Sequence, residues 1–353
     1  MRQHSYFHLR ESARFSIFAL TLLAAPFVAG RLAWAESPRT VGSIERLDPA
    51  LDALIPADAK MEVIGEGYEW CEGPVWVRDG GFLLFSDIPN NAIMRWDAKS
   101  GSRLYLKPAG YTGRDPRGGE SGSNGLAVDR QSRLVLCQHG DRRLARLDTL
   151  GDKPQANYKT LADRFEGKRF NSPNDAVVDS HGAIYFTDPP YGLEKGMEDS
   201  KKELSFQGVY RLSPDGKLKL LTKELERPNG IALSPDEKTL YVANSHDTRN
   251  IIMAFPLNSD GSLGQGREFF SAQELLGKQP GSCDGLTVDK QGNIFATIPS
   301  GVAIFAPDGK QIGLLNTGDR TANVEFGEDG STLFICANHN LLRIRTSTKG
   351  IGF

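Results

Sequence analysis

The sequence predicts an all-β protein built as a six-bladed β-propeller. A short segment recurs six times along the chain, at intervals of 39 to 55 residues. Each copy is followed by a turn rich in Gly or Asp and then by a second apolar run, and most units continue into a third run. A period of roughly 40–55 residues with three or four strands per unit is typical of a propeller blade. Six such units fill the chain.

The first 35 residues are expected to be a signal peptide. Arg10 and Arg14 precede an uncharged, mostly apolar run over residues 15–30, and Ala33-Trp-Ala35 places small residues at the two positions that a signal peptidase reads. An uncleaved anchor is the alternative, but this run is shorter than the roughly 20 residues that span a bilayer. We therefore expect cleavage after Ala35 and a periplasmic or secreted protein that is not attached to a membrane.

Residues 36–60 are expected to form a leader segment, and residues 61–353 a single catalytic propeller domain. Leu47 to Lys60 has weak helical character. Met61-Glu-Val-Ile64 has the pattern of a strand that could pair with the last blade. Mixing N- and C-terminal strands in one blade is a common way for a propeller to protect its exposed edges.

The first run of each unit begins with a side chain that carries an oxygen atom. The six copies are Glu72-Gly-Pro-Val, Asn124-Gly-Leu-Ala, Asn174-Asp-Ala-Val, Asn229-Gly-Ile-Ala, Asp284-Gly-Leu-Thr and Asn323-Val-Glu-Phe. The innermost strands of a propeller surround its axis, so these six positions are expected to form a ring at one mouth of the tunnel.

A ring of two carboxylates and four amides predicts a cation site. The carboxylates would repel each other and have few donors facing them. A hard divalent cation would remove that conflict, and oxygen-only ligands favour Ca²⁺, with Mg²⁺, Mn²⁺ or Zn²⁺ as alternatives. The other interpretation is that Asn and Asp begin strands after turns because they hydrogen-bond their own backbone.

The four cysteines are expected to be buried free thiols. Cys71 and Cys283 precede ring residues, and Cys137 and Cys336 lie in second runs. Because equivalent positions in different blades occupy different sectors of the ring, Cα separations below about 7 Å are not expected. The sequence contains no Cys-x-x-Cys and no His cluster, which excludes the common zinc and redox motifs. A net charge of −2 and the lack of a basic stretch argue against nucleic acid as a partner.

Several motifs together resemble the gluconolactonase branch of the SMP-30/gluconolactonase/luciferin-regenerating-enzyme family. They are Glu72-Gly-Pro-Val-Trp, Phe85-Ser-Asp-Ile-Pro-Asn, Asn171-Ser-Pro-Asn-Asp, Phe186-Thr-Asp-Pro-Pro-Tyr-Gly, Arg227-Pro-Asn-Gly, Ser234-Pro-Asp-Glu and Asp284-Gly. The resemblance runs from about Leu47 to the C-terminus. It implies a six-bladed propeller with one catalytic divalent metal, usually calcium, bound by Glu72, Asn174, Asn229 and Asp284. Asn124 and Asn323 would then lie behind the ligands or face the substrate.

The resemblance and the predicted metal together indicate hydrolysis of a lactone. A lactone is an ester, and its hydrolysis passes through an oxyanion that a Lewis-acidic metal can stabilise. Asp284 is the candidate general base. The alternative is that Asp284 is only a ligand and that metal-bound hydroxide attacks. The sequence has no Gly-x-Ser-x-Gly, so a serine hydrolase is not indicated.

Four further residues are candidates for binding substrate. Asn124 belongs to the ring, His139 ends a predicted strand of the second unit, and Asp188 and Tyr191 belong to a Pro-Pro loop. A hydrogen-bonded strand end and an Asp-Pro turn would explain His139 and Asp188 equally well. Trp70 and Trp76 flank Glu72 and are expected in the core.

The sequence thus predicts an exported, metal-dependent hydrolase of a sugar lactone such as glucono-1,5-lactone. Another aldonolactone or an organophosphate ester is the alternative substrate, because a fold does not determine a substrate. A propeller that binds protein or glycan, with a purely structural metal, is the alternative from a different class. The lactone, the physiological metal and the oligomeric state are not determined by the sequence.

Overall fold

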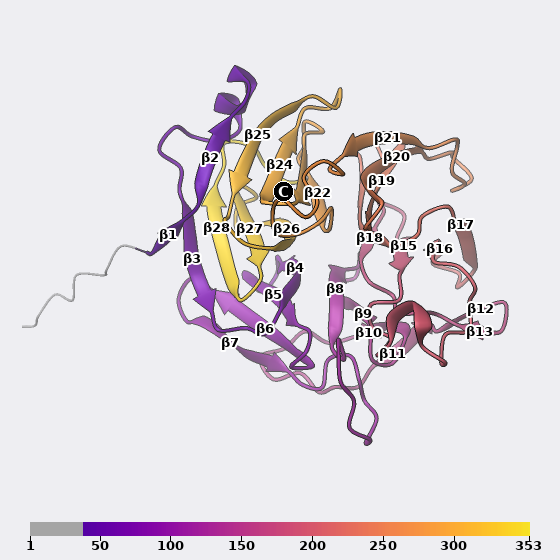
Figure 1. The fold of residues 1–353 in the computed structure, drawn as a ribbon. Helices are drawn as coiled ribbons and strands as arrows, with labels where there is room; N and C mark the ends of the chain where they lie inside the picture. The colour runs from indigo at the N-terminus through magenta and orange to yellow at the C-terminus, as the bar shows by residue number, and fades with distance from the viewer. Residues whose placement is uncertain (1–37) are drawn as a thin grey trace, which may run out of the picture. The chain divides into compact units, whose positions relative to one another are not determined.

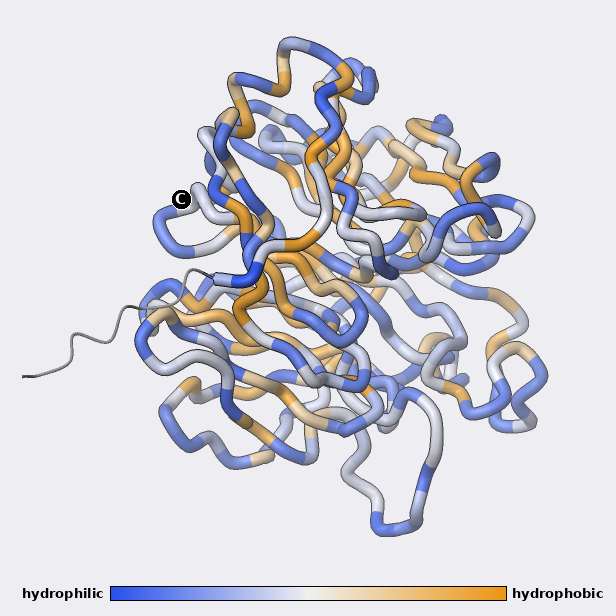
Figure 2. The backbone as a smooth tube through the Cα atoms, turned by 60° about the vertical axis from the view of Figure 1, so that its left-hand side comes forward, coloured by the Kyte–Doolittle hydropathy of each residue, from blue (hydrophilic) through white to orange (hydrophobic). Residues whose placement is uncertain are grey.

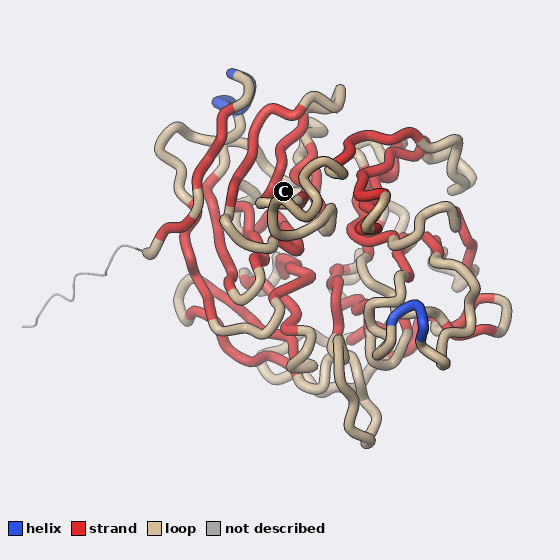
Figure 3. The backbone as a smooth tube through the Cα atoms, viewed as in Figure 1, coloured by secondary structure: helices blue, strands red, loops and turns tan. Residues whose placement is uncertain are grey.

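The computed structural model describes residues 38–353, so the predicted signal peptide and its cleavage site lie outside the described residues. Those residues form seven antiparallel sheets, and the six larger sheets are arranged around a centre, which confirms the predicted propeller (Figure 1). Strands and connecting loops account for nearly all of the backbone (Figure 3). Among the described residues, no helix has the length and apolar character needed to cross a membrane.

The first four blades each have four strands. Blade one contains β4 (Cys71–Val77), β5 (Phe82–Asp87), β6 (Ala92–Asp97) and β7 (Gly101–Leu106). Blade two contains β8 (Ser123–Val128), β9 (Leu134–Gln138), β10 (Arg143–Leu147) and β11 (Lys159–Ala162). Blade three contains β14 (Ala176–Val178), β15 (Ile184–Asp188), β16 (Gly208–Leu212) and β17 (Leu218–Thr222). Blade four contains β18 (Pro228–Leu233), β19 (Thr239–His246), β20 (Arg249–Pro256) and β21 (Arg267–Ser271).

Blades five and six each include strands from the N-terminal segment. Blade five contains β22 (Leu286–Val288), β23 (Ile294–Ile298), β24 (Gly301–Phe305), β25 (Gln311–Asn316) and β2 (Ser43–Arg46). Blade six contains β26 (Thr321–Gly327), β27 (Thr332–Ala337), β28 (Asn340–Arg345), β3 (Met61–Glu66) and β1 (Thr40–Val41). The predicted pairing of residues 61–64 with the last blade is confirmed, because β3 pairs with β28. The strand β2 adds a second closure that the sequence did not indicate.

Three short elements lie outside the blades. They are the hairpin β12 (Arg164–Phe165) with β13 (Lys168–Arg169), the 3₁₀ helix η1 (Pro49–Ala53), and the 3₁₀ helix η2 (Gly196–Glu198). The weak helical character of residues 47–60 corresponds to η1. Asp48 caps η1 by accepting a hydrogen bond from the Ala50 N–H at 2.8 Å, and Leu51 is buried between blades five and six.

The core consists of six apolar clusters, one between each pair of neighbouring blades. Apolar residues follow the strands and polar residues follow the loops (Figure 2). Between blades six and one, Phe334 stacks on Trp76 with ring centroids 5.7 Å apart, so Trp76 belongs to the core as predicted. Both faces of each sheet are buried against a neighbour, which explains why the strands are apolar runs rather than alternating ones.

The four cysteines are buried, as the sequence predicts. The expectation that they lie far apart is wrong for one pair, since the sulfurs of Cys71 and Cys336 are 2.9 Å apart. Cys71 begins β4 at the edge of blade one, and the Cys71 N–H donates to the Asn338 carbonyl of blade six at 2.9 Å. The start of β4 thus contacts blade six directly, and this contact brings Cys71 next to Cys336 although the two residues belong to different blades.

Candidate active site

The six predicted ring residues lie at or just before the first strand of each blade. Consecutive first strands contact one another all the way around, from β4 through β8, β14, β18, β22 and β26 back to β4 (Figure 1). The pairing register shifts beside four of these residues, between 72 and 75, 123 and 126, 228 and 231, and 321 and 323. Such bulges redirect a side chain, here at the start of the strands that surround the axis.

A glycine after the ring residue lets neighbouring first strands approach each other closely. A Cβ atom at Gly230 would lie 2.2 Å from the carbonyl oxygen of Asp284, and one at Gly73 would lie 2.1 Å from that of Asn124. A Cβ atom at Gly125 would lie 2.4 Å from Asp175 Oδ1, and one at Gly285 would lie 2.1 Å from the Asn323 side chain. Glycine follows Glu72, Asn124, Asn229 and Asp284 because the first strands pack too closely there to leave room for a side chain.

Five of the six ring residues line one cavity of about 320 Å³. They are Glu72, Asn124, Asn174, Asn229 and Asp284. The four residues predicted as metal ligands are thus brought together from four different blades. The sixth, Asn323, does not line the cavity, and its Nδ2 donates to Glu72 Oε2 at 3.0 Å while its Oδ1 accepts the Val324 N–H. Asn323 therefore lies behind Glu72 and hydrogen-bonds to it. Its bond to the backbone of the next residue is the kind of contact expected for an Asn that begins a strand after a turn.

The two carboxyl groups of the ring are poorly compensated. Burial raises the pKa of Glu72 to about 8, and the Asp175 carboxylate adds to this increase. Burial, then Glu72, then Asp175 hold the pKa of Asp284 well above its usual range. No ion pair reaches either carboxylate among residues 38–353. A positive charge in the cavity would favour the ionised form of both groups.

Side-chain oxygens of Asn174, Asn229 and Asp284 are available to a ligand. Asn174 Oδ1 and Asp284 Oδ1 are buried and have no hydrogen-bond partner among the described residues. Asn229 donates through Nδ2 to Ser245 Oγ at 2.8 Å, which leaves its Oδ1 free to coordinate. Orphaned buried acceptors are costly unless a donor or a cation satisfies them.

The donor set fits a hard divalent cation. It consists of the oxygen atoms of Glu72, Asn174, Asn229 and Asp284, with neither nitrogen nor sulfur. Within the described part of the chain, no group of three or more His, Cys, Asp or Glu side chains is placed to hold a metal ion, so the amides of Asn174 and Asn229 are needed to complete this donor set. Carboxylate and amide oxygens together are typical ligands of Ca²⁺.

The predicted substrate-binding residues divide into two groups. Asn124 and Tyr191 line the cavity. Asp188 and His139 are completely buried and do not line it. Asp188 accepts hydrogen bonds from the backbone N–H groups of Asn171 and Ser172 at 2.9 and 2.8 Å, and burial raises its pKa to about 7. Its observed contacts hold the loop that leads to Asn174, and direct substrate binding by Asp188 or His139 stays a prediction.

Glu120 is a cavity residue that sequence reasoning missed. Its carboxylate lines the cavity, and its Oε2 lies 3.0 Å from Nδ1 of the buried His139. His139 therefore does not line the cavity itself but contacts Glu120, which does.

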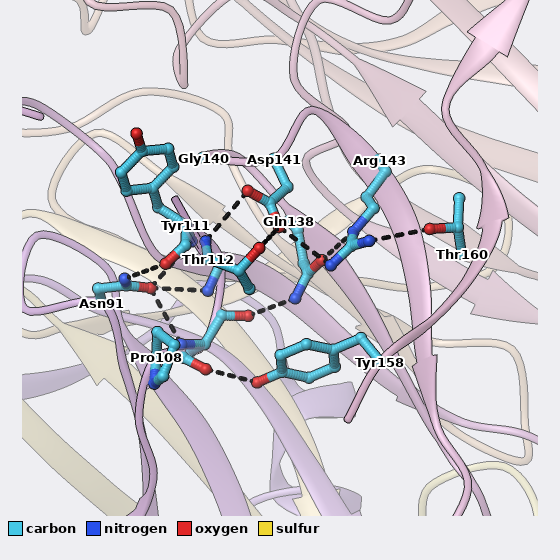
Figure 4. Close-up of polar contacts among 12 residues, drawn as sticks. Asn91, Pro108, Tyr111, Thr112, Gln138, Gly140, Asp141, Arg143, Tyr158 and Thr160 are labelled. Carbon is cyan, nitrogen blue, oxygen red and sulfur yellow. Dashed lines mark hydrogen bonds and ion pairs between the residues drawn. The ribbon is translucent and has the colours of Figure 1, made fainter. Parts of the chain in front are cut away.

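The base of this connection is anchored by side chains of blades one and two (Figure 4). Asn91 Oδ1 accepts the backbone N–H groups of Ala109, Gly110 and Tyr111 at 2.7 to 3.1 Å. Tyr158 donates to the Pro108 carbonyl at 2.6 Å, and Gln138 donates to the Ala109 carbonyl at 2.8 Å. These anchors give the loop a defined path towards the cavity.

The mouth of the cavity carries charges of both signs and an indole. Arg227 pairs with Asp247 at 3.3 Å, and Arg320 also lines the cavity. Trp70 lines it too, so the expectation that Trp70 belongs to the core is wrong. A mixed polar wall with an aromatic side chain suits a polyhydroxylated ligand better than a purely apolar one.

Comparisons with known proteins agree with this architecture. A family model described as the SMP-30/gluconolactonase/LRE-like region matches residues 70–339. A gluconolactonase of Zymomonas mobilis is 44% identical over 321 residues, which cover 88% of each chain. A solved gluconolactonase structure from Xanthomonas campestris has a TM-score of 0.74 and 32% identity, covering 88% of this chain and 98% of that one. The diisopropyl-fluorophosphatase of Loligo vulgaris is 22% identical and covers 78% of this chain and 88% of its own. The chain therefore belongs to the SMP-30/gluconolactonase/LRE-like family.

Proposed function

We propose that this protein is an enzyme that hydrolyses a sugar lactone, with a divalent metal, most simply Ca²⁺, held by Glu72, Asn174, Asn229 and Asp284. The observation that carries the proposal is the convergence of these four side chains on one cavity, with the oxygens of Asn174 and Asp284 left unpaired. The similarity to the gluconolactonase of Zymomonas mobilis supports lactone hydrolysis over other reactions. When bound, the metal would supply Lewis acidity towards the lactone carbonyl.

The chain's own residues supply the remaining steps. Asp284 lies at the cavity with Oδ1 unpaired, so its carboxylate can accept the proton of the attacking water. The alternative, in which Asp284 serves only as a ligand, predicts that its replacement changes metal affinity and activity in parallel.

The cavity wall would orient the sugar. Asn124, Tyr191 and Glu120 present an amide, a phenol and a carboxylate to the space in front of the ring. Burial raises the pKa of the Tyr191 phenol above its ordinary value, so this group is a hydrogen-bond donor at neutral pH. These groups can bind ring hydroxyls, whose directions differ between aldonolactones.

The experiment is a pH-stat assay of acid release from glucono-1,5-lactone, corrected for spontaneous hydrolysis. The wild type should be active, lose activity on chelation, and regain it with Ca²⁺. Asp284→Asn should remain folded and be inactive, whereas Asp308→Asn, at an exposed turn away from the cavity, should behave as the wild type. Activity that survives complete chelation would contradict the role of the metal.

A second substrate class is favoured by one specific relationship, the similarity to the diisopropyl-fluorophosphatase of Loligo vulgaris. A panel of five- and six-membered aldonolactones and one dialkyl fluorophosphate decides between the classes. We expect kcat/KM to be highest for a lactone. A higher value for the fluorophosphate would replace the proposed substrate without changing the proposed site.

We also propose that the protein is exported, because residues 15–30 are uncharged and Ala33 and Ala35 fit a signal peptidase site. Mass spectrometry of the protein from its native host should find a chain that begins at Glu36. A chain that retains residues 1–35 in the cytoplasm would contradict export.

A further inference from the structure

The contact between blades six and one contains a pair of cysteines that the proposed lactone hydrolysis does not use. Cys71 begins β4, Cys336 lies in β27, and their sulfurs are 2.9 Å apart. Both residues are completely buried in the apolar cluster between the two blades. A disulfide bond is about 2.05 Å long, so the two sulfurs would have to approach by only about 0.9 Å.

In three other blades, the second-strand residue at the position equivalent to Cys336 forms a hydrogen bond to the next blade. In blades one, three and five, a second-strand hydroxyl donates to a backbone carbonyl in the first-strand region of the next blade. These bonds run from Ser86 to Asn124 at 2.8 Å, from Thr187 to Asn229 at 2.7 Å, and from Thr297 to Ala322 at 3.3 Å. In blade six the second-strand residue opposite the ring residue Asn323 is Cys336, and its thiol meets Cys71 of blade one. A pair of sulfurs therefore stands where other blades use a hydroxyl hydrogen bond.

We propose that Cys71 and Cys336 form a disulfide that joins blade six to blade one when the chain folds in contact with a small-molecule disulfide. Each cysteine loses one proton and one electron, and the S–S bond forms. The oxidant's own disulfide accepts both electrons and both protons and leaves as two thiols. Because both sulfurs are inaccessible in the folded protein, oxidation takes place while the last blade docks against the first.

The other two cysteines remain thiols. Cys137 is buried between blades two and three, and Cys283 between blades four and five. Each lies in an apolar cluster that contains no second cysteine. The structure therefore brings together one pair of the four cysteines and keeps the other two apart.

The cross-link would act on both the ring and the site. It would close a loop between positions 265 residues apart in sequence, and long loops gain most from cross-linking in the chain-entropy account. Cys71 immediately precedes Glu72, which Asn323 of blade six already contacts at 3.0 Å. The disulfide would thus hold the start of β4 at the place where the ring carboxylate is presented.

The experiment counts thiols in the protein refolded with and without oxidant. The chain is reduced and unfolded, then refolded with oxidised glutathione or with excess dithiothreitol, and unfolded again near neutral pH in a denaturant that contains an excess of alkylating agent. The glutathione sample should show two alkylated cysteines, Cys137 and Cys283, and a peptide in which Cys71 is joined to Cys336. Its thermal midpoint should exceed that of the dithiothreitol sample by roughly 3–8 °C.

Matched variants separate the cross-link from the burial of two small side chains. Cys71→Ala/Cys336→Ala should show the same thermal midpoint with both refolding buffers, whereas Cys137→Ala/Cys283→Ala should keep the difference between them. If the first variant does not fold, the thiol count of the wild type still decides the question. Four alkylated cysteines in the oxidised wild type, or a joined peptide with any other pairing, would overturn the proposal.

Discussion

Replacing Glu72 by Gln should remove a distinct part of a pH-dependent loss of stability in the metal-free protein. The folded-state pKa of Glu72 is raised from an ordinary value of 4.5 to about 8. Between these values the folded chain binds more protons than the unfolded chain, so stability is highest at low pH and falls as the pH rises. Each pH unit in this window costs up to about 1.4 kcal/mol for one carboxyl group.

The magnitude follows from this slope. From about pH 5 to about pH 8, ionisation of Glu72 should lower the free energy of unfolding of the chelated wild type by roughly 3–4 kcal/mol. Gln has nearly the same shape and can still accept the hydrogen bonds that Glu72 Oε2 receives from the Gly73 N–H and Asn323 Nδ2. Glu72→Gln should therefore leave only the part of the pH dependence that arises from the other carboxyl groups whose pKa is raised by burial, which are Asp284, Asp188, Asp175 and Glu325.

The assay is urea unfolding in the presence of a chelator at several pH values, followed by the same series with Ca²⁺. Calcium should restore the stability of the wild type near pH 8, because the cation favours the ionised carboxylate, and should restore that of Glu72→Gln much less. Glu198→Gln, at an exposed position of η2, is the matched control and should follow the wild type. A chelated wild type whose stability is flat from about pH 5 to about pH 8 would refute the reasoning.

Four further outcomes are expected. Asp284→Asn should lower kcat for lactone hydrolysis by at least about a thousandfold with little change in thermal midpoint; a kcat close to that of the wild type would remove Asp284 from the mechanism. Asn174→Ala removes one unpaired buried oxygen, so calorimetry should find Ca²⁺ binding at least about tenfold weaker, and unchanged affinity would exclude it as a ligand. Gly230→Ala places a Cβ 2.2 Å from the Asp284 carbonyl oxygen, so it should lower the free energy of unfolding in urea by about 1–3 kcal/mol or more. Gly151→Ala is the control, because nothing lies within 4 Å of the added Cβ, and it should leave that free energy nearly unchanged. Glu120→Gln should raise KM for the lactone more than it lowers kcat, and the reverse pattern would mean that Glu120 takes part in the chemical step.

The repeat made the fold predictable. Apolar runs such as Ile184 to Phe186, separated by Gly- and Asp-rich turns, occur because each blade is buried on both faces. Each run can be recognised from its own residues, without knowledge of the rest of the chain. The ring was predictable for a similar reason. In Asn229-Gly230, the Asn supplies the side chain at the start of a first strand, and the Gly leaves room for the backbone of the next blade.

Several features depended on contacts that the repeat does not encode. Glu120 lies in a long connection whose path is set by Asn91 and Tyr158, so its place at the cavity could not be inferred from its neighbours in sequence. Tyr191 and Asp188 belong to one predicted loop, yet only Tyr191 lines the cavity.

The sequence by itself determined the six blades, the N-terminal strand that completes the last one, and the ring of oxygen-bearing residues. Each of these follows from periodicity and from local backbone and burial requirements. The tertiary structure alone decided that β2 joins blade five, that Trp70 and Glu120 line the cavity, and that Cys71 meets Cys336. These contacts arise where the ring closes or where a loop crosses a blade, and their distances depend on the packing of all six blades together.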